Sequence, residues 1–262
     1  EVVRQLPRES VLYFGDTARL PYGERSQAEI LQFVREIIRW MLSQGVKMVV
    51  MACNTSSALA LETVQAEFDI PILGIILPGA RTAAKSGQRI GVISTPATAK
   101  SNAYRQAILE ANAGAEVWQV GCSEFVPLIE QNLIRHPQTL AVARRYIDPL
   151  LEAQIDTLVY GCTHYPHLAP VLKQFLPPQI RLVNPAHALV QAMGKELDVL
   201  GLRRIDASRR TLEFYVSGCP DQFATLSTQW LTYRPLVEPV SLTTLLQSTV
   251  IAVPENATVR AA

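Results

Sequence analysis

Two short apolar runs in this chain each end at a cysteine that is followed by small polar residues. The first spans residues 48–57, MVVMACNTSS, and places Cys53 directly after the apolar segment. The second begins at residue 157 and ends with Cys162, Thr163 and His164. Such runs are typical of buried strands, and the segment after Cys53 is compatible with a helix. The repeat predicts two similar half-molecules, each with a thiol at the carboxyl end of a strand, where open α/β sheets bind ligands.

The rest of the chain is expected to alternate between strands and helices. Ser26 and Glu29 form a capping-box signature, and Gly45 suits the end of the helix that follows. This alternation favours an α/β fold with parallel sheets. Pro78-Gly79 ends an apolar run and marks the expected boundary between the halves. Further strands are predicted over residues 11–14, 70–77, 89–94, 116–120, 181–183 and 212–216, and further helices over residues 139–153 and 186–200.

Length and charge limit the kinds of protein that this chain can be. With 262 residues, 48% of them hydrophobic, the chain is long enough for two domains with substantial cores. A net charge of +1 does not indicate nucleic acid or an anionic membrane surface as a partner, and no apolar stretch approaches the length of a membrane span. The four cysteines form no CxxC pair, so free thiols in the reducing cytoplasm are expected.

The two thiols are the strongest indication of chemistry. The positive end of a helix dipole is expected to lower the pKa of a thiol at a helix N-terminus and so favour the thiolate. Thiols on two facing halves, Cys53 and Cys162, suit the removal of a proton from one face of a carbon and its return to the other. The alternative interpretation is that both are buried structural cysteines.

Polar residues next to the thiols are candidates for binding a carboxylate. Asn54, Thr55 and Thr163 offer side-chain and backbone donors at these turns, although the same residues could simply cap helices. A second carboxylate could lie against other turns that follow strands, which would otherwise be ordinary turns. The residues of those turns are Tyr22, Gly23, Thr95 and Thr98. Tyr160 is expected in the core or in the lining of a pocket.

His164 allows two interpretations. Together with Cys162 and His167 it could form a Cys-x-His-x-x-His metal site. Pro166 and the lack of a fourth nearby ligand argue against a metal. We therefore predict that His164 is an acid–base partner that keeps Cys162 as a thiolate. No phosphate-binding loop, dinucleotide fingerprint or evident anchor lysine for pyridoxal phosphate is present, so no cofactor is expected.

Five sequence motifs resemble a known enzyme family. They are GDTARLPYG at 15–23, ACNTSSA at 52–58, PGA at 78–80, CSEFVPLIE at 122–130 and DTLVYGCTHYPHL at 156–168. On these motifs the chain resembles the cofactor-independent aspartate/glutamate racemases over roughly residues 1–235. The paired CNT and CTH motifs are shared with relatives that act on aspartate, hydantoins or arylmalonates. The Leu-Pro-Tyr-Gly loop and the Cys-Thr-His-Tyr-Pro form resemble the members that act on glutamate.

The resemblance implies a specific architecture. It implies an α/β fold of two pseudo-symmetric domains with mostly parallel sheets flanked by helices and with the active site in the cleft between them. The first domain would comprise residues 1–77 and 185–235, and the second residues 78–184. Residues 236–262 would be a C-terminal tail of unknown role. The family also opens with a strand that carries an Asp-Ser-Gly motif, whereas this chain begins downstream of it at Glu1. An upstream segment with site residues, needed for full activity, is therefore expected.

The resemblance also implies roles for the candidate residues. Cys53 would handle the α-proton on the D face of glutamate, and Cys162, assisted by His164, the proton on the L face. The α-carboxylate and the amino group would be held by Asn54, Thr55 and Thr163. The side-chain carboxylate would face Tyr22, Gly23 and the loop from Thr95 to Thr98.

The function implied is that of a cytoplasmic isomerase that interconverts L- and D-glutamate and supplies D-glutamate for peptidoglycan. A homodimer is the assembly expected from the resemblance. Two alternatives follow from relatives of the family. A related decarboxylase would need only one thiol, so the pair of cysteines argues against it. Some racemases of this type also bind DNA gyrase, but no basic or acidic cluster marks such a surface here.

Overall fold

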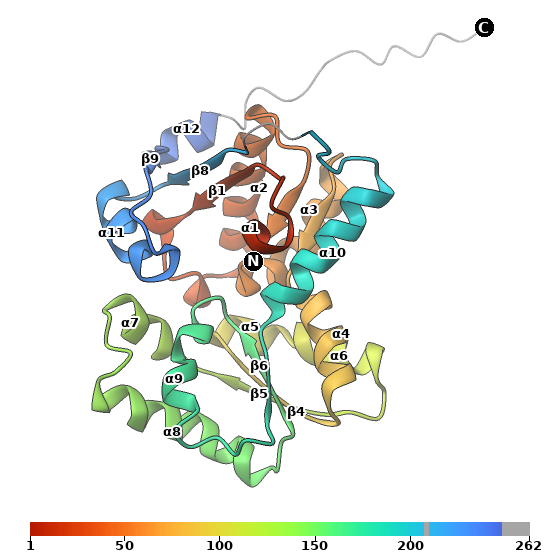
Figure 1. The fold of residues 1–262 in the computed structure, drawn as a ribbon, viewed down its shortest axis with the longest axis vertical. Helices are drawn as coiled ribbons and strands as arrows, with labels where there is room; N and C mark the ends of the chain where they lie inside the picture. Colours follow the sequence, from red (N-terminus) through yellow and green to blue (C-terminus); the bar gives the residue numbers. More distant parts are fainter. Residues whose placement is uncertain (207–209, 248–262) are drawn as a thin grey trace, which may run out of the picture.

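A computed structural model describes residues 1–206 and 210–247 and shows an α/β protein (Figure 1). The strands of the described part form three sheets, in which every paired strand is parallel to its neighbour. The first sheet has the order β1-β8-β9, the second β2-β3 and the third β5-β4-β6-β7. The expected α/β class with parallel sheets is therefore confirmed. The strands are β1 (Val11–Gly15), β2 (Val49–Met51), β3 (Ile72–Gly74), β4 (Arg89–Ser94), β5 (Glu116–Gly121), β6 (Thr157–Gly161), β7 (Arg181–Val183), β8 (Leu212–Val216) and β9 (Glu238–Pro239).

Helices flank these sheets, and within the described ranges none of them is both long and apolar enough to cross a lipid bilayer. The predicted capping box at Ser26 is present, because its hydroxyl accepts from the Glu29 N–H and the Glu29 carboxylate accepts from the Ser26 N–H. The α-helices are α1 (Val2–Gln5), α2 (Gln27–Ser43), α3 (Asn54–Glu67), α4 (Ile76–Ser86), α5 (Pro96–Ser101), α6 (Ala103–Ala111), α7 (Phe125–Glu130), α8 (Pro137–Glu152), α9 (Ala169–Leu172), α10 (Pro185–Val199), α11 (Pro220–Leu231) and α12 (Leu242–Gln247). The 3-10 helices are η1 (Thr17–Arg19), η2 (Tyr22–Glu24) and η3 (Tyr165–Leu168).

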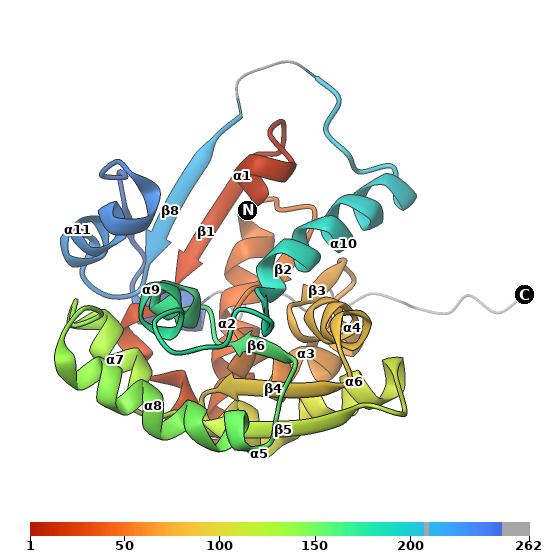
Figure 2. The ribbon, with the colours of Figure 1, turned by 60° about the horizontal axis from the view of Figure 1, so that its bottom comes forward.

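The sheet β5-β4-β6-β7 is buried on both faces, as is usual for parallel sheets. Leu158 of β6 packs on one face in a cluster with Phe125 and Ile147 of α7 and α8. Val159, the next residue, packs on the other face with residues of α4 and α6. This alternation follows from the two-residue period of a strand. Figure 2 shows α7 and α8 on one side of this sheet.

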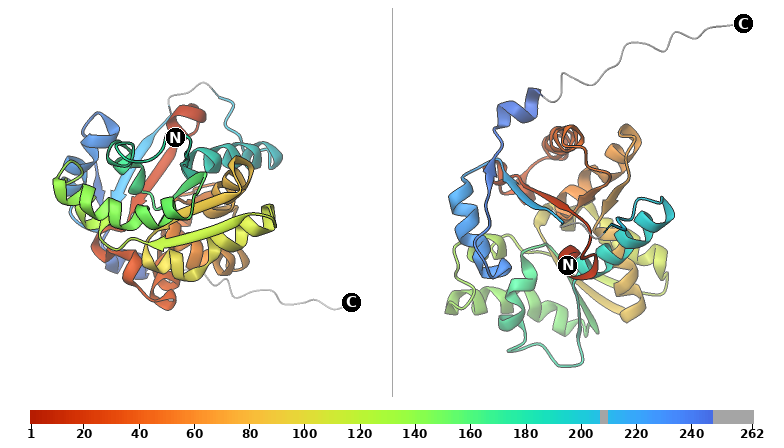
Figure 3. Two further views of the ribbon diagram at one scale, coloured as in Figure 1. Left: turned by 90° about the horizontal axis from the view of Figure 1, so that it is seen from below. Right: turned by 45° about the horizontal axis from the view of Figure 1, so that its top comes forward.

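The chain returns from this sheet to the first one. After β7, α10 leads to β8, which pairs with β1 over Leu212–Val216 (Figure 3). The four strands between Arg89 and Val183 thus form one sheet, while strands from both ends of the chain form another. This return supports our proposal that residues 1–77 and 185–235 form one domain and residues 78–184 the other.

A strand is present within the predicted range 70–77, but the prediction that it extends to Pro78-Gly79 is wrong. The strand is limited to Ile72–Gly74, and Pro78 and Gly79 lie inside α4. Proline is tolerated there because the first turn of a helix has no intrahelical partner for its N–H groups. A Cβ on Gly79 would lie 2.7 Å from Cβ of Pro185, so the glycine permits a close approach between α4 and α10.

The start of the predicted C-terminal tail is part of the fold. β9 pairs with β8, and Leu245 of α12 packs with Val240 and with Trp40 of α2. The sequence signal was weak because β9 has two residues and α12 has six, which is too short for a recognisable period. Residues 248–262 of the predicted tail lie outside the described residues.

Candidate active site

Cys53 and Cys162 lie beyond the carboxyl ends of strands from two different sheets. Cys53 follows β2 and is the N-cap residue of the 14-residue helix α3. Cys162 follows β6 directly and is buried. Asn54, the residue after Cys53, lines one cavity together with Cys162, and the charge of Cys162 contributes to raising the pKa of Cys53. The tertiary structure therefore brings together the two cysteines that the sequence repeat singled out.

The pKa of Cys53 shifts in the direction opposite to the one predicted from the helix dipole. Burial raises this pKa and is the largest cause. Hydrogen bonds from Ser56 and from the backbone of Thr55 lower the pKa but only partly compensate. The pKa of the thiol is raised overall, so Cys53 is held in its protonated form.

Cys162 lies at one end of a chain of three side chains. Its Sγ lies 3.8 Å from Nδ1 of His164, and Nε2 of His164 lies 2.6 Å from Oε1 of Glu130. Burial lowers the pKa of His164, but the hydrogen bonds with Cys162 and Glu130 outweigh it and raise the pKa to about 10. The imidazole is therefore charged at neutral pH and stands between a thiol and a carboxylate.

The metal alternative finds no support in the described residues. The His167 ring stacks on Trp230, with ring centroids 4.8 Å apart, while His164 faces Cys162 and Glu130. Within residues 1–206 and 210–247 no three His, Cys, Asp or Glu side chains are grouped so as to hold a metal ion.

Three threonine hydroxyls meet where α3 approaches α5. Oγ1 of Thr55 lies 3.0 Å from Oγ1 of Thr95 and 3.2 Å from Oγ1 of Thr98, and the last two hydroxyls are 3.0 Å apart. All three residues are buried. A Cβ on Gly23 would lie 2.8 Å from Cβ of Thr95, so only a glycine allows η2 to approach this cluster so closely.

The phenol of Tyr22 is engaged within the protein. It donates a hydrogen bond to Oδ2 of Asp16, which also accepts from Nε of Arg19 at 2.6 Å. Arg19 pairs in addition with the buried Glu36. Burial and the charge of Asp16 raise the pKa of Tyr22. Because the phenol of Tyr22 already donates to Asp16, a ligand at this position would be bound by the backbone and not by the phenol.

Asn54 has one hydrogen-bonded end and one unpartnered end. Its Oδ1 accepts a hydrogen bond of 2.7 Å from the hydroxyl of Tyr104. Its Nδ2 is buried and has no hydrogen-bond partner among the described residues. Asn54 lines a cavity of about 190 Å³ together with Cys162, Thr163 and Tyr160. Thr163 itself is exposed.

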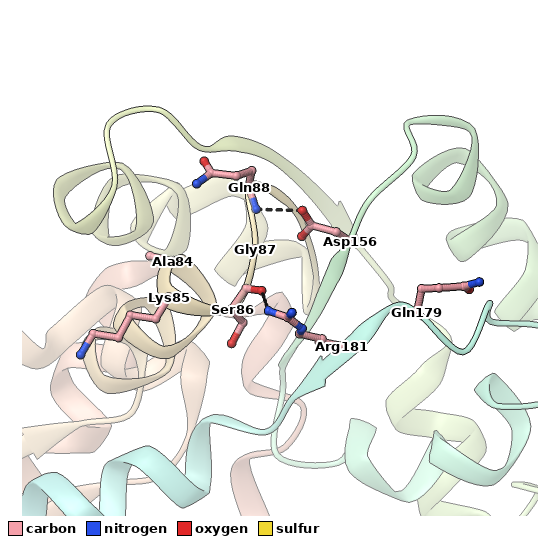
Figure 4. Close-up of a pocket in the computed structure, with 8 residues that line it drawn as sticks. All are labelled: Ala84, Lys85, Ser86, Gly87, Gln88, Asp156, Gln179 and Arg181. Atoms are coloured by element: carbon pink, nitrogen blue, oxygen red, sulfur yellow. Dashed lines mark hydrogen bonds between the residues drawn. The ribbon is translucent and has the colours of Figure 1, made fainter.

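A larger cavity of about 320 Å³ lies at the opposite edge of the sheet, at the amino ends of β4, β6 and β7 (Figure 4). Oδ2 of Asp156 accepts from the N–H of Gln88 at 2.8 Å, and Arg181 donates to the Ser86 carbonyl. Neither cysteine lines this cavity. Ligands of open α/β sheets bind at carboxyl ends, so the candidate site is the cavity beside Cys162.

The comparison with protein families agrees with this geometry. The model of the Asp/Glu/Hydantoin racemase family matches residues 1–193, which include both cysteines and His164. The chain belongs to that family.

Individual racemases are similar over nearly the whole chain. The glutamate racemase of Synechocystis sp. is 65% identical over 242 residues, which cover 92% of this chain and 86% of that protein. The crystal structure of glutamate racemase isoform RacE1 from Bacillus anthracis aligns with a TM-score of 0.88 at 33% identity, covering 92% and 91% of the two chains. The structure of Francisella tularensis glutamate racemase in complex with D-glutamate aligns with a TM-score of 0.85 at 32% identity, with the same coverage.

Three residues of the candidate site have no role in the sequence-based prediction. Glu130 orients His164, Tyr104 holds Asn54, and Asp16 binds Tyr22. Glu130 and Asp16 lie within motifs that carry the family resemblance, which was the available signal. Tyr104 lies in no such motif, and its contact with Asn54 joins residues 50 positions apart.

Proposed function

We propose that this racemase interconverts L- and D-glutamate by a two-base mechanism in which Cys53 and Cys162 face opposite sides of the α-carbon. The observation that carries the proposal is the approach of two thiols from two sheets, one of which, Cys162, lines a cavity together with Asn54, the neighbour of Cys53. The similarity to proteins named glutamate racemase, one of them in complex with D-glutamate, supports glutamate as the substrate.

In the L-to-D direction the Cys162 thiolate removes the α-proton. His164 is charged at neutral pH, since its pKa is about 10, and its N–H donor stabilises the neighbouring thiolate. Glu130 accepts from the other nitrogen and so orients the ring. Cys53, held protonated by burial, then donates its proton to the opposite face of the carbanion. Proton exchange with solvent restores the two thiols to their starting states.

The carboxylates of glutamate require donors on both sides of the reacting carbon. Asn54, Thr55 and Thr163 hold the α-carboxylate and the amino group. The Thr95–Thr98 hydroxyls and the backbone of Tyr22 and Gly23 hold the side-chain carboxylate. Hydrogen bonds to charged groups are stronger than those between neutral groups, so these contacts orient the substrate firmly.

The physiological role follows from the resemblance of the sequence. We propose that the D-glutamate is used for peptidoglycan synthesis, that the reaction takes place in the cytoplasm without a cofactor, and that the protein can form a homodimer. These statements rest on the family and not on the geometry of the site.

The test is racemisation in deuterated water with L-glutamate, with L-aspartate in parallel and no added pyridoxal phosphate or metal. D-glutamate formed early should carry deuterium at its α-carbon, because its proton comes from the opposite, solvent-exchanged thiol. The remaining L-glutamate should carry little deuterium at first. Early D-glutamate that retains protium would exclude two bases, and faster turnover of aspartate would exclude glutamate as the preferred substrate.

A further inference from the structure

The hydroxyl of Tyr160 is a buried polar group without a hydrogen-bond partner. The side chain is buried, with 4% of its surface exposed, and the described residues offer its Oη no hydrogen bond. Other buried tyrosines nearby have partners. The hydroxyl of Tyr104 donates to Asn54, and that of Tyr165 donates to the carbonyl of Cys122 at 2.8 Å. A buried hydroxyl without a partner is unfavourable, so something else is expected to bind it.

Tyr160 borders the cavity beside the second thiol. It lies on β6, two residues before Cys162, and both side chains belong to the same buried cluster. Both line the cavity of about 190 Å³, which has room for several water molecules. Residues of η3 and of the start of α10 form the other walls.

A second unpartnered donor lines the same cavity. Asn54, which is 2% exposed, has its Oδ1 occupied by Tyr104, whereas its Nδ2 has no partner. Burial raises the pKa of Tyr160 to about 12, so its hydroxyl keeps the proton at neutral pH. Two residues with an unused donor, one from each half of the molecule, therefore line one cavity, and a carboxylate has lone pairs enough for both donors.

We propose that Tyr160 is a substrate-binding residue, whose hydroxyl donates, together with Nδ2 of Asn54, to the α-carboxylate of glutamate in the cavity beside Cys162. The inference rests on the proposed function and extends it to a residue that neither the motif resemblance nor the capping pattern assigned. An ordered water that bridges the two donors is the competing occupant.

The test is Tyr160→Phe, with Tyr165→Phe as the matched control. Tyr160→Phe removes an unpartnered hydroxyl, so the Tm of the free protein should stay unchanged or rise. The increase in Tm caused by D-glutamate should be lost, and KM for both enantiomers should rise roughly 10- to 100-fold, as expected for a lost hydrogen bond to a charged group. The kcat should change less. Tyr165→Phe should lower the Tm of the free protein and keep the increase caused by D-glutamate.

Two outcomes would overturn the inference. A fall in Tm like that of Tyr165→Phe, with normal KM, would assign the hydroxyl to a bridging water or another structural contact. An unchanged increase in Tm with D-glutamate would show that the hydroxyl does not touch substrate. If the unmodified protein binds D-glutamate in a Tyr160-dependent way but does not racemise it, the proposed function fails and this inference stands.

Discussion

The two thiol sites follow the same sequence pattern but have different surroundings. Cys53 begins a helix of 14 residues, and the hydrogen bonds that lower the pKa of its thiol come from the turn that follows it. Cys162 precedes the 3-10 helix η3, which has only four residues, and has His164 beside it, which in turn contacts Glu130. A short 3-10 helix has only a small dipole to stabilise a thiolate. At Cys162 the charged imidazolium of His164 provides this stabilisation instead.

This difference shows that one chemical task can be supported in two ways. At Cys53 the backbone of a helix N-terminus is fixed by the fold and does not titrate. At Cys162 the support is a side chain whose charge depends on pH and on Glu130. We therefore expect the two halves of the reaction to respond differently to substitutions and to pH.

The largest effect is expected from removing either thiol. Cys53→Ala and Cys162→Ala should each lower racemisation by orders of magnitude, because one face of the carbon loses its base. Each variant should retain proton exchange on one face only. In deuterated water Cys162→Ala should exchange the α-proton of D-glutamate, and Cys53→Ala that of L-glutamate, as followed by NMR.

The exposed Cys219 provides the matched control, since Cys219→Ala should behave like the unmodified protein. Near-normal turnover of Cys162→Ala would make this cysteine a structural residue and would remove the basis of the comparison.

A smaller effect is expected from Glu130→Gln, which weakens the support of only one thiol. It should lower kcat/KM roughly 100-fold, the lower end of what general acid–base groups contribute. In Glu130→Gln the kinetic isotope effect should increase for α-deuterated L-glutamate, whose deuteron is removed by Cys162. The isotope effect for α-deuterated D-glutamate should stay unchanged.

The control is Glu124→Gln. Glu124 lies at the start of α7, the helix that ends at Glu130, and its carboxylate pairs with Arg145. It should leave both isotope effects unchanged. Equal increases for the two enantiomers in Glu130→Gln would mean that Glu130 supports the whole cleft and not one thiol.

The smallest effect is expected from pH. Folding raises the pKa of His164 from 6.5 to about 10, so the stability that this group contributes is fully present below pH 6.5 and is lost as the pH rises through about 10. The value of kcat/KM should fall over the upper part of this window as the imidazolium loses its proton.

Measurements of kcat/KM and Tm between pH 6 and 10.5 check this expectation. In Glu130→Gln the fall in kcat/KM should begin at lower pH, because the carboxylate no longer stabilises the charged ring. An identical pH profile in the two proteins would show that the charge of His164 does not depend on Glu130.

The sequence by itself determined the features that depend on neighbouring residues. Apolar runs that end at Cys53 and Cys162 are local, as are the Ser26 cap and the position of His164 two residues after Cys162. These patterns sufficed for the parallel α/β class and for the choice of the candidate residues, whose roles stay predictions. They did not suffice at Pro78-Gly79, where proline in the first turn of a helix resembles proline in a loop.

Only the tertiary structure decided which distant groups meet and what burial does to them. Glu130 reaches His164 across 34 positions, and Tyr104 reaches Asn54 across 50. The phenol of Tyr22 proved to be occupied by Asp16, whereas that of Tyr160 proved to have no partner. The direction in which the pKa of Cys53 shifts also depended on packing, because desolvation raises this pKa by more than the hydrogen bonds of the turn lower it. Local sequence specifies the turn, but desolvation is a property of everything packed around it.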